Sequence, residues 1–205
     1  MRTRVVYLAA ASLTAGALVL PLWGFAMTAP QYPDETLHLQ VARVGLTGDV
    51  HEITSLQQYI GVHFPTDLPE LVWSTRAIAG LSVLLLIAAF AGIGTVARWY
   101  RAACAAAAIV FVLTSATVVQ GRLYRVGHER DPQAPLRSIR NFTPPLVGPV
   151  KVGNFTVWSF PHVGAVFLLA ATVLSAAGVR TKGCDERRLA GPRDPGVTVP
   201  DKAVA

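Results

Sequence analysis

The chain has 205 residues, of which 52% are hydrophobic and only 15% charged, and its formal net charge is +6. Its basic residues are dispersed, without a stripe of Lys and Arg interleaved with aromatic residues, which argues against a nucleic-acid partner and for a lipid bilayer. Four apolar runs lack Asp, Glu, Lys and Arg, and each is close to the about 20 residues that a helix needs to cross a bilayer; they are residues 5–27, 77–97, 102–119 and 157–179. We therefore expect an all-α membrane protein with four transmembrane helices and a small extracytoplasmic cap.

Residues 1–28 are predicted to form a retained N-terminal anchor helix. A cleaved secretory signal is the alternative, because Arg2 and Arg4 precede the apolar run and small residues follow it. The anchor is favoured since the run is longer than the about 7–15 apolar residues of a signal core and Pro30 lies at the plausible cleavage points. Pro21 is expected to bend the outer end of this helix without ending it.

Residues 29–76 form a first extracytoplasmic segment that is long enough to fold into part of the cap. Apolar and polar residues alternate over residues 37–42, which predicts a half-buried strand. Gly45 and Gly48 indicate a turn, and Asp49 is placed to cap a following short helix, which Gly61 would end. The cap is thus expected to contain a short strand, a short helix and a long ordered loop.

Residues 77–119 are predicted to form a transmembrane hairpin whose tight turn contains Arg98 and Arg101. Short basic loops stay in the cytoplasm, so the turn and both termini of a multi-pass protein are placed there. The predicted spans contain no Asp, Glu, Lys or Arg at membrane depth, which argues against a channel, carrier or proton pump.

Residues 120–156 form the second extracytoplasmic stretch, which is rich in Pro, Gly and Arg and has no evident periodic element. A loop of this length is usually functional or disordered, and its apolar residues favour packing against the first segment. Residues 157–180 are predicted to form the fourth transmembrane helix, and residues 181–205, which include three prolines, a disordered cytoplasmic tail.

Both outer stretches contain short strings rich in Pro, Gly, Tyr and His: Ala29-Pro30-Gln31-Tyr32-Pro33, Tyr59-Ile60-Gly61, Gly127-His128 with Asp131-Pro132 and Ala134-Pro135, and Pro144-Pro145-Leu146-Val147-Gly148. In these strings, and in span order over roughly residues 23–161, the chain resembles an uncharacterised bacterial family of four-span membrane proteins. That family tends to accompany maturation genes of copper proteins, including those of nitrous oxide reductase. One departure is that Gln57-Gln58 stands where the family has Asn-His, and Val62-His63 where it has Met.

The resemblance implies a protein of the bacterial cytoplasmic membrane, copper as the cofactor to consider, and a membrane or extracytoplasmic protein as the partner, such as a copper enzyme or chaperone. The residues of the strings that would contact this partner are Pro30, Tyr32, Tyr59, Gly61, Pro135, Pro144 and Pro145.

The metal hypothesis concerns side chains on the outer side of the predicted membrane. Neutral imidazole suits copper or zinc, and a thioether favours the cuprous ion. The candidate ligands are His128, Asp131, His63, His51, His162 and Met27, and among them Asp131 could orient His128 by accepting its second ring proton. The alternatives are that His128 and Asp131 only shape their loop, that His162 is interfacial and that His51 is solvated. No His-x-x-x-His string or Cys pair strengthens the metal site.

Catalysis is not expected, because neither a Gly-x-Ser-x-Gly string nor a phosphate-binding glycine loop is present. The first hypothesis is a non-catalytic accessory protein that assists maturation or copper supply of an extracytoplasmic metalloenzyme. The alternative is a structural subunit of a larger membrane complex without its own metal. A third reading, a membrane enzyme acting on a lipid or quinone near Arg122, Arg125, His128 and His162, requires a lipid-sized cleft there.

Overall fold

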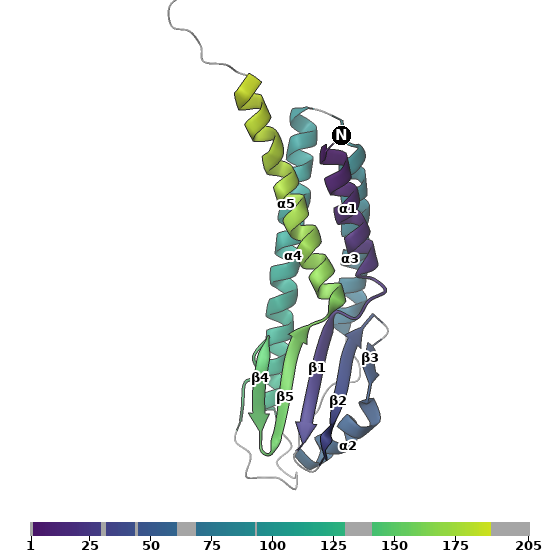
Figure 1. Cartoon of the computed structure of the whole chain (residues 1–205), viewed down its shortest axis with the longest axis vertical. Helices are drawn as coiled ribbons and strands as arrows, with labels where there is room; N and C mark the ends of the chain where they lie inside the picture. The colour runs from purple at the N-terminus through teal and green to yellow at the C-terminus, as the bar shows by residue number, and fades with distance from the viewer. Residues whose placement is uncertain are drawn as a thin grey trace, which may run out of the picture.

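The computed structural model describes residues 2–29, 32–43, 45–60, 69–92, 94–129 and 141–189. Figure 1 shows the long helices side by side at one end of the molecule and a sheet with a short helix at the other. In chain order the elements are α1 (Arg2–Gly16), β1 (Trp23–Ala29), β2 (Tyr32–Ala42), β3 (Gly45–Gly48), α2 (Val50–Ile60), α3 (Pro69–Phe90), α4 (Thr95–His128), β4 (Gly148–Val152), β5 (Phe155–Pro161) and α5 (Val163–Leu189).

The prediction of an all-α protein with four transmembrane helices is wrong. The described residues form a five-stranded antiparallel sheet, in the order β3-β2-β1-β5-β4, together with five helices. Within the described part of the chain, only α3, over Glu70–Phe90, and α4 are both long and apolar enough to cross a membrane. Fewer than a quarter of the residues in the most apolar window of each are buried, unlike the core helix of a soluble protein.

The first predicted span fails because tertiary hydrogen bonds replace helical ones after Gly16. The Leu22 amide donates to the Val41 carbonyl at 2.8 Å, and the Gly164 amide donates to the Pro21 carbonyl at 2.9 Å. Pro21 therefore lies in the connection to β1 and does not bend a continuing helix. An apolar run can be a buried strand as well as a helix, and β1 is the central strand of the sheet.

Other predicted boundaries also differ from those of the structure. The helix α4 continues to His128, because Leu123 and Val126 beyond the predicted membrane boundary are buried against the sheet. The predicted fourth span begins inside β5, and the predicted tail begins inside α5, while residues 190–205 lie outside the described part. A strand hairpin thus occupies a stretch that was expected to lack periodic structure.

That hairpin connects β4 and β5 through Gly153 and Asn154, with Val152 paired to Phe155. Gly153 has φ 60°, and glycine at the first central position is the requirement of a two-residue type II′ turn. The Gly-Asn pair between two apolar strands is therefore a sequence pattern that predicts a hairpin.

The predicted strand over residues 37–42 and the helix after Asp49 are both present, as β2 and α2. Asp49 occupies the capping position, and its carbonyl accepts the Ile53 amide at 3.1 Å. Its carboxylate also accepts the His38 amide at 2.8 Å, so this side chain joins α2 to β2.

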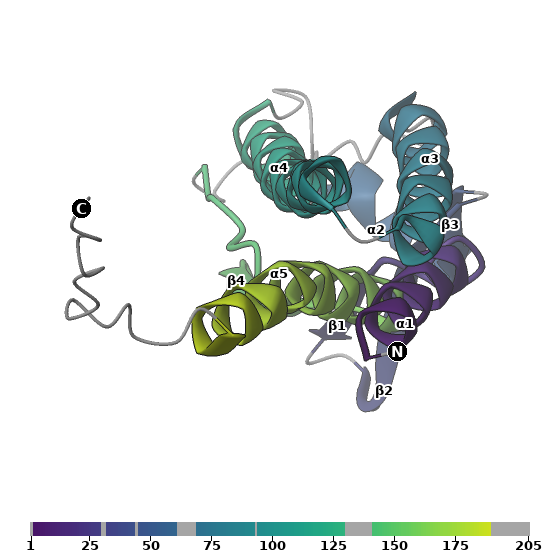
Figure 2. The same ribbon diagram turned by 90° about the horizontal axis from the view of Figure 1, so that it is seen from above.

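The four long helices enclose a core of small and aliphatic side chains. Figure 2 looks along the bundle, with α3 and α4 on one side and α1 and α5 on the other. The helix α1 packs on α3 and α5, and α4 packs on α3 and α5. Small side chains allow such close approach of helices, and the core includes Tyr7, Ala10, Leu85, Ala88, Cys104, Ala108 and Ala171.

Candidate functional site

The proposed metal ligands are not brought together in the part of the chain that the structure describes. Within these residues there is no group of three or more His, Cys, Asp or Glu side chains that could hold a metal ion. His51 is exposed in the first turn of α2, and Met27 packs against the cluster of Val126, Val152 and Phe155. Asp131 and His63 lie outside the described residues.

His128 interacts with its own helix. Its ring stacks on Tyr124 with 3.9 Å between the ring centroids, and its Nδ1 lies 2.9 Å from the Tyr124 carbonyl oxygen. His162 lies between β5 and α5, and its Nδ1 is buried without a hydrogen-bond partner in the described structure. The described contact of the His128 ring is thus with Tyr124, one turn earlier on α4.

The Gly-His and Pro-Pro strings join the second outer stretch to α4. A Cβ atom on Gly127 would lie 1.9 Å from the Phe142 carbonyl oxygen, so only glycine allows this approach. The Gln120 side chain donates to the Pro144 carbonyl at 3.2 Å, and Pro145 follows in the same segment.

Of the other proposed partner contacts, Tyr32 begins β2 and Tyr59 lies in α2, whereas Pro30, Gly61 and Pro135 lie outside the described residues.

Sequence reasoning missed a cavity of about 310 Å³ where the helices meet the sheet, which we call the junction cavity. Its walls come from α3, α4 and α5, from Leu22 and the first residue of β1, from the ends of β2 and β5, and from the segment before β4. They include Trp23, Leu71, Trp73, Phe111, Val119 and Leu168. No local pattern could have identified this site, because its lining residues are distributed over most of the chain.

Polar groups lie at this apolar cavity. Glu70, in the first turn of α3, accepts hydrogen bonds on Oε1 from Arg122 of α4, one of them from Nε at 2.6 Å. The second carboxylate oxygen, Oε2, is buried without a partner among the described residues, and so is the Ser115 hydroxyl oxygen. Both side chains line the cavity, so its wall contains hydrogen-bonding capacity that the surrounding protein does not use.

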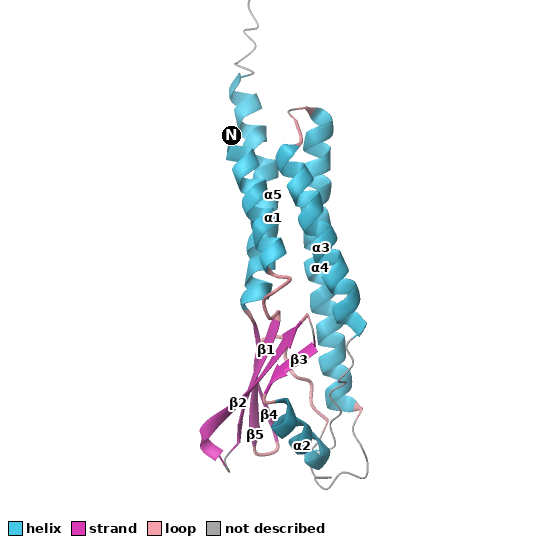
Figure 3. Ribbon diagram, turned by 90° about the vertical axis from the view of Figure 1, so that its right-hand side faces the viewer, coloured by secondary structure: helices cyan, strands magenta, loops and turns pink. Residues whose placement is uncertain are grey.

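A second surface is the side of the sheet that no described helix covers, which we call the open sheet face; its residues are Gly24, Ala26, His38, Gln40, Trp158 and Phe160. Alternate residues of a strand point to opposite sides, and the other set in β5, which includes Phe155 and Ser159, is buried toward α4 and α2. Trp158 is 50% exposed and is paired with Ala26. In Figure 3, α2 and α4 lie on one side of the sheet only.

The sheet is joined rigidly to the segment beside it. The Trp23 indole donates to the Ser159 hydroxyl at 2.8 Å, and this hydroxyl donates to the Leu146 carbonyl at 2.8 Å. The open sheet face is therefore presented by a backbone that hydrogen bonds fix from the other side.

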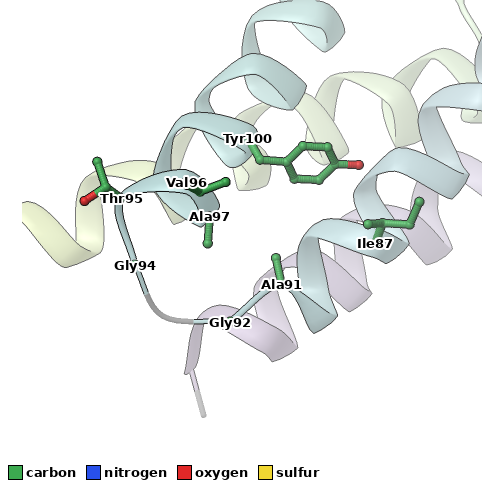
Figure 4. A pocket seen from close by; sticks show the side chains of 8 residues that line it. All are labelled: Ile87, Ala91, Gly92, Gly94, Thr95, Val96, Ala97 and Tyr100. Carbon is green, nitrogen blue, oxygen red and sulfur yellow. The ribbon is translucent and has the colours of Figure 1, made fainter.

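The opposite end of the molecule has a shallow apolar hollow at the turn between α3 and α4. Figure 4 shows Tyr100 of α4 extending toward α3 near Ile87, and its hydroxyl donates to the Leu84 carbonyl at 3.1 Å. Nearby, Arg101 is only 5% exposed and donates to the Ala88 and Ala91 carbonyls at 3.2 and 2.7 Å. Arg101 thus satisfies carbonyls at the end of α3 and is not a free charge of the turn.

Comparison of the chain with protein-family models, with curated proteins and with solved structures finds no match.

Proposed function

We propose that this is a non-catalytic integral membrane accessory protein, whose α3–α4 hairpin crosses the bilayer and whose open sheet face binds a partner protein. The hairpin supports the first half. At about 1.5 Å per residue, the 21 residues Glu70–Phe90 extend about 31 Å, the thickness of a bilayer core. Large apolar side chains are exposed along both helices, and lipid would cover them; examples are Val83, Ile87, Phe90, Val110 and Leu113.

The protein would reside in a bacterial cytoplasmic membrane as a multi-pass protein, with the α3–α4 turn on the cytoplasmic side. In Figure 1 the N-terminus lies near this turn, at the end of the molecule remote from the sheet. Arg4 and Arg98 belong to the same end, and a bias of basic residues toward the cytoplasm supports this orientation. The sheet and α2 would then be extracytoplasmic.

Labelling of single cysteines tests the orientation. A membrane-impermeant maleimide should label Thr47→Cys in β3 on intact spheroplasts, and Thr95→Cys at the start of α4 only after lysis. Both side chains are exposed, and the unmodified chain gives the background from its own cysteines. The reverse pattern would invert the topology, and equal labelling of both variants before lysis would refute the spanning hairpin.

The observation that carries the docking half is the half-exposed Trp158 on the open sheet face. Tryptophan is enriched among the residues that contribute most to binding at protein interfaces. Its cross-strand neighbour is the small residue Ala26, and Phe160 lies over Gly24, where an added Cβ would meet its ring at 2.6 Å. This combination of aromatic rings over small residues favours a folded protein surface as the occupant.

Site-specific photocrosslinking in cells tests the docking. A photoreactive phenylalanine in place of Trp158 should give one discrete adduct with an extracytoplasmic protein, whereas the same substitution at the exposed Glu52 of α2, on the other side of the sheet, should not. An adduct of two copies of this chain, or the same adducts from both positions, would contradict the proposal.

The resemblance supports a metalloenzyme maturation factor as the more specific role, with copper as the metal supplied. Titration of the purified protein with cuprous and cupric ions, with and without His128→Ala, tests this part. Stoichiometric binding that His128→Ala weakens would support it. A metal-free protein that co-purifies with a partner at fixed stoichiometry would instead select the structural-subunit alternative.

A further inference from the structure

We propose that the junction cavity binds one neutral amphipathic molecule, an apolar tail with a hydroxyl-bearing head, and that the head lies against Glu70 and Ser115. This site is separate from the open sheet face, so its occupancy can be measured independently of any protein partner.

The position of the cavity gives a membrane-soluble molecule access to it. Trp73 of α3 and Leu169 of α5 line the cavity and are also 40% and 46% exposed, so part of its lining is open to the surface of the bundle. If the α3–α4 hairpin crosses the bilayer as proposed, lipid would cover the surface of α3 around Trp73. An apolar molecule could therefore enter from the bilayer without crossing water.

The walls determine what the tail must be. The aliphatic and aromatic side chains of the lining come from all three helices, and Trp73 meets Phe111 edge to face with 6.3 Å between the ring centroids. Such a surface favours hydrocarbon, because burial of apolar area is favourable and non-directional. At about 30 Å³ for each heavy atom, the volume that one liquid water occupies, a cavity of about 310 Å³ holds roughly ten heavy atoms. It would enclose a head and the start of a tail.

The unpartnered oxygens determine what the head must be. Glu70 Oε2 can accept hydrogen bonds but is buried without a donor among the described residues, while Glu70 Oε1 already accepts from Arg122. A hydroxyl group on the head would donate to Oε2, and its oxygen could accept the Ser115 hydroxyl proton. A buried polar group without a partner is costly, so a ligand that supplies both partners gains affinity from them.

The Glu70 carboxylate disfavours an anionic head. Glu70 is the one charged residue among the described lining residues, and Arg122, which pairs with its Oε1, is not among them. A carboxylate or phosphate placed there would meet the Glu70 carboxylate in a low-dielectric site, where like charges repel strongly. A quinol and a glycerol with one acyl chain share the required chemistry, namely a neutral hydroxyl head on an apolar tail.

Native mass spectrometry of the full chain, released from phosphatidylcholine nanodiscs, tests the proposal. The probes are decylubiquinol, monooleoylglycerol and, as the anionic control, oleate. One equivalent of at least one neutral probe is expected to bind, with no adduct of oleate. The neutral probe that binds identifies the source of the ligand.

Variants assign the binding to the cavity. Ala116→Phe fills the space beside Ser115 and is expected to remove the adduct, whereas Ala107→Phe, on the exposed side of the same helix, should preserve it. Ser115→Ala removes one hydrogen bond and should weaken binding about fivefold without unfolding the protein, because its hydroxyl has no partner in the described structure. Absence of an adduct with both neutral probes, equal binding of oleate, or unchanged binding by Ser115→Ala together with Ala116→Phe would overturn the proposal.

Discussion

Replacement of Arg101 by methionine should destabilise the helical bundle strongly, although this arginine lies near the turn between α3 and α4. The Arg101 guanidinium donates to two carbonyls at the end of α3 and lies 5.7 Å from the centre of the Tyr7 ring. Hydrogen bonds of a charged donor contribute about 1.5–3 kcal/mol each, and the cation–π contact contributes about 0.5–1 kcal/mol. Methionine retains the apolar packing of the side-chain stem and relieves the desolvation of a buried charge, which offsets part of the loss. We expect a net decrease of about 2–4 kcal/mol in the free energy of unfolding.

The assay is equilibrium unfolding of the full chain in mixed micelles of increasing SDS content, followed by circular dichroism. Arg101→Lys should lose less than Arg101→Met, because lysine keeps the charge but lacks the planar fork that reaches two carbonyls. Arg125→Met, at an exposed position of the same helix, is the matched control and should change stability by less than about 0.5 kcal/mol. A loss for Arg101→Met no larger than that of the control would refute the capping role.

Two further substitutions test the attachment of the sheet to the helices. Gly127→Ala should destabilise the protein by about 1–3 kcal/mol, because its Cβ would overlap the Phe142 carbonyl oxygen. Gly121→Ala, where an added Cβ has no atom within 4 Å, is the control and should be neutral or slightly stabilising. Equal unfolding midpoints of the two variants would show that the segment at Phe142 moves aside. Ser159→Ala should lower the free energy of unfolding by about 2–4 kcal/mol, because it leaves the Trp23 indole N–H and the Leu146 carbonyl without their partner. Unchanged stability together with unchanged Trp fluorescence would exclude this hydrogen-bonded link.

Local patterns predicted those parts of the fold that local forces determine. The alternation over residues 37–42 gave β2, and Asp49 with the apolar spacing after it gave α2. The Gly153-Asn154 turn was equally local, but the surrounding proline-rich and glycine-rich sequence obscured the strands on either side. The Gly-Asn pair is nevertheless a hairpin signal that the sequence contains.

The candidate sites depended on contacts between distant segments. Glu70 and Arg122 are on different helices, and nothing in the residues around either one indicates that they pair. The proposed histidine ligands shared a predicted side of the membrane, yet His128 interacts with Tyr124 of its own helix and His51 lies exposed on α2. Sharing one side of a membrane is a much weaker constraint than sharing a ligand sphere.

The sequence by itself determined that α3 and α4 would be long apolar helices, because hydropathy is a property of a continuous segment and an isolated helix satisfies its own backbone hydrogen bonds. Only the tertiary structure decided that the apolar residues of β1 would form a central strand, since strand hydrogen bonds need partners from elsewhere in the chain. The same apolar side chains suit a membrane helix and a buried strand, and the partners β2 and β5 select between them.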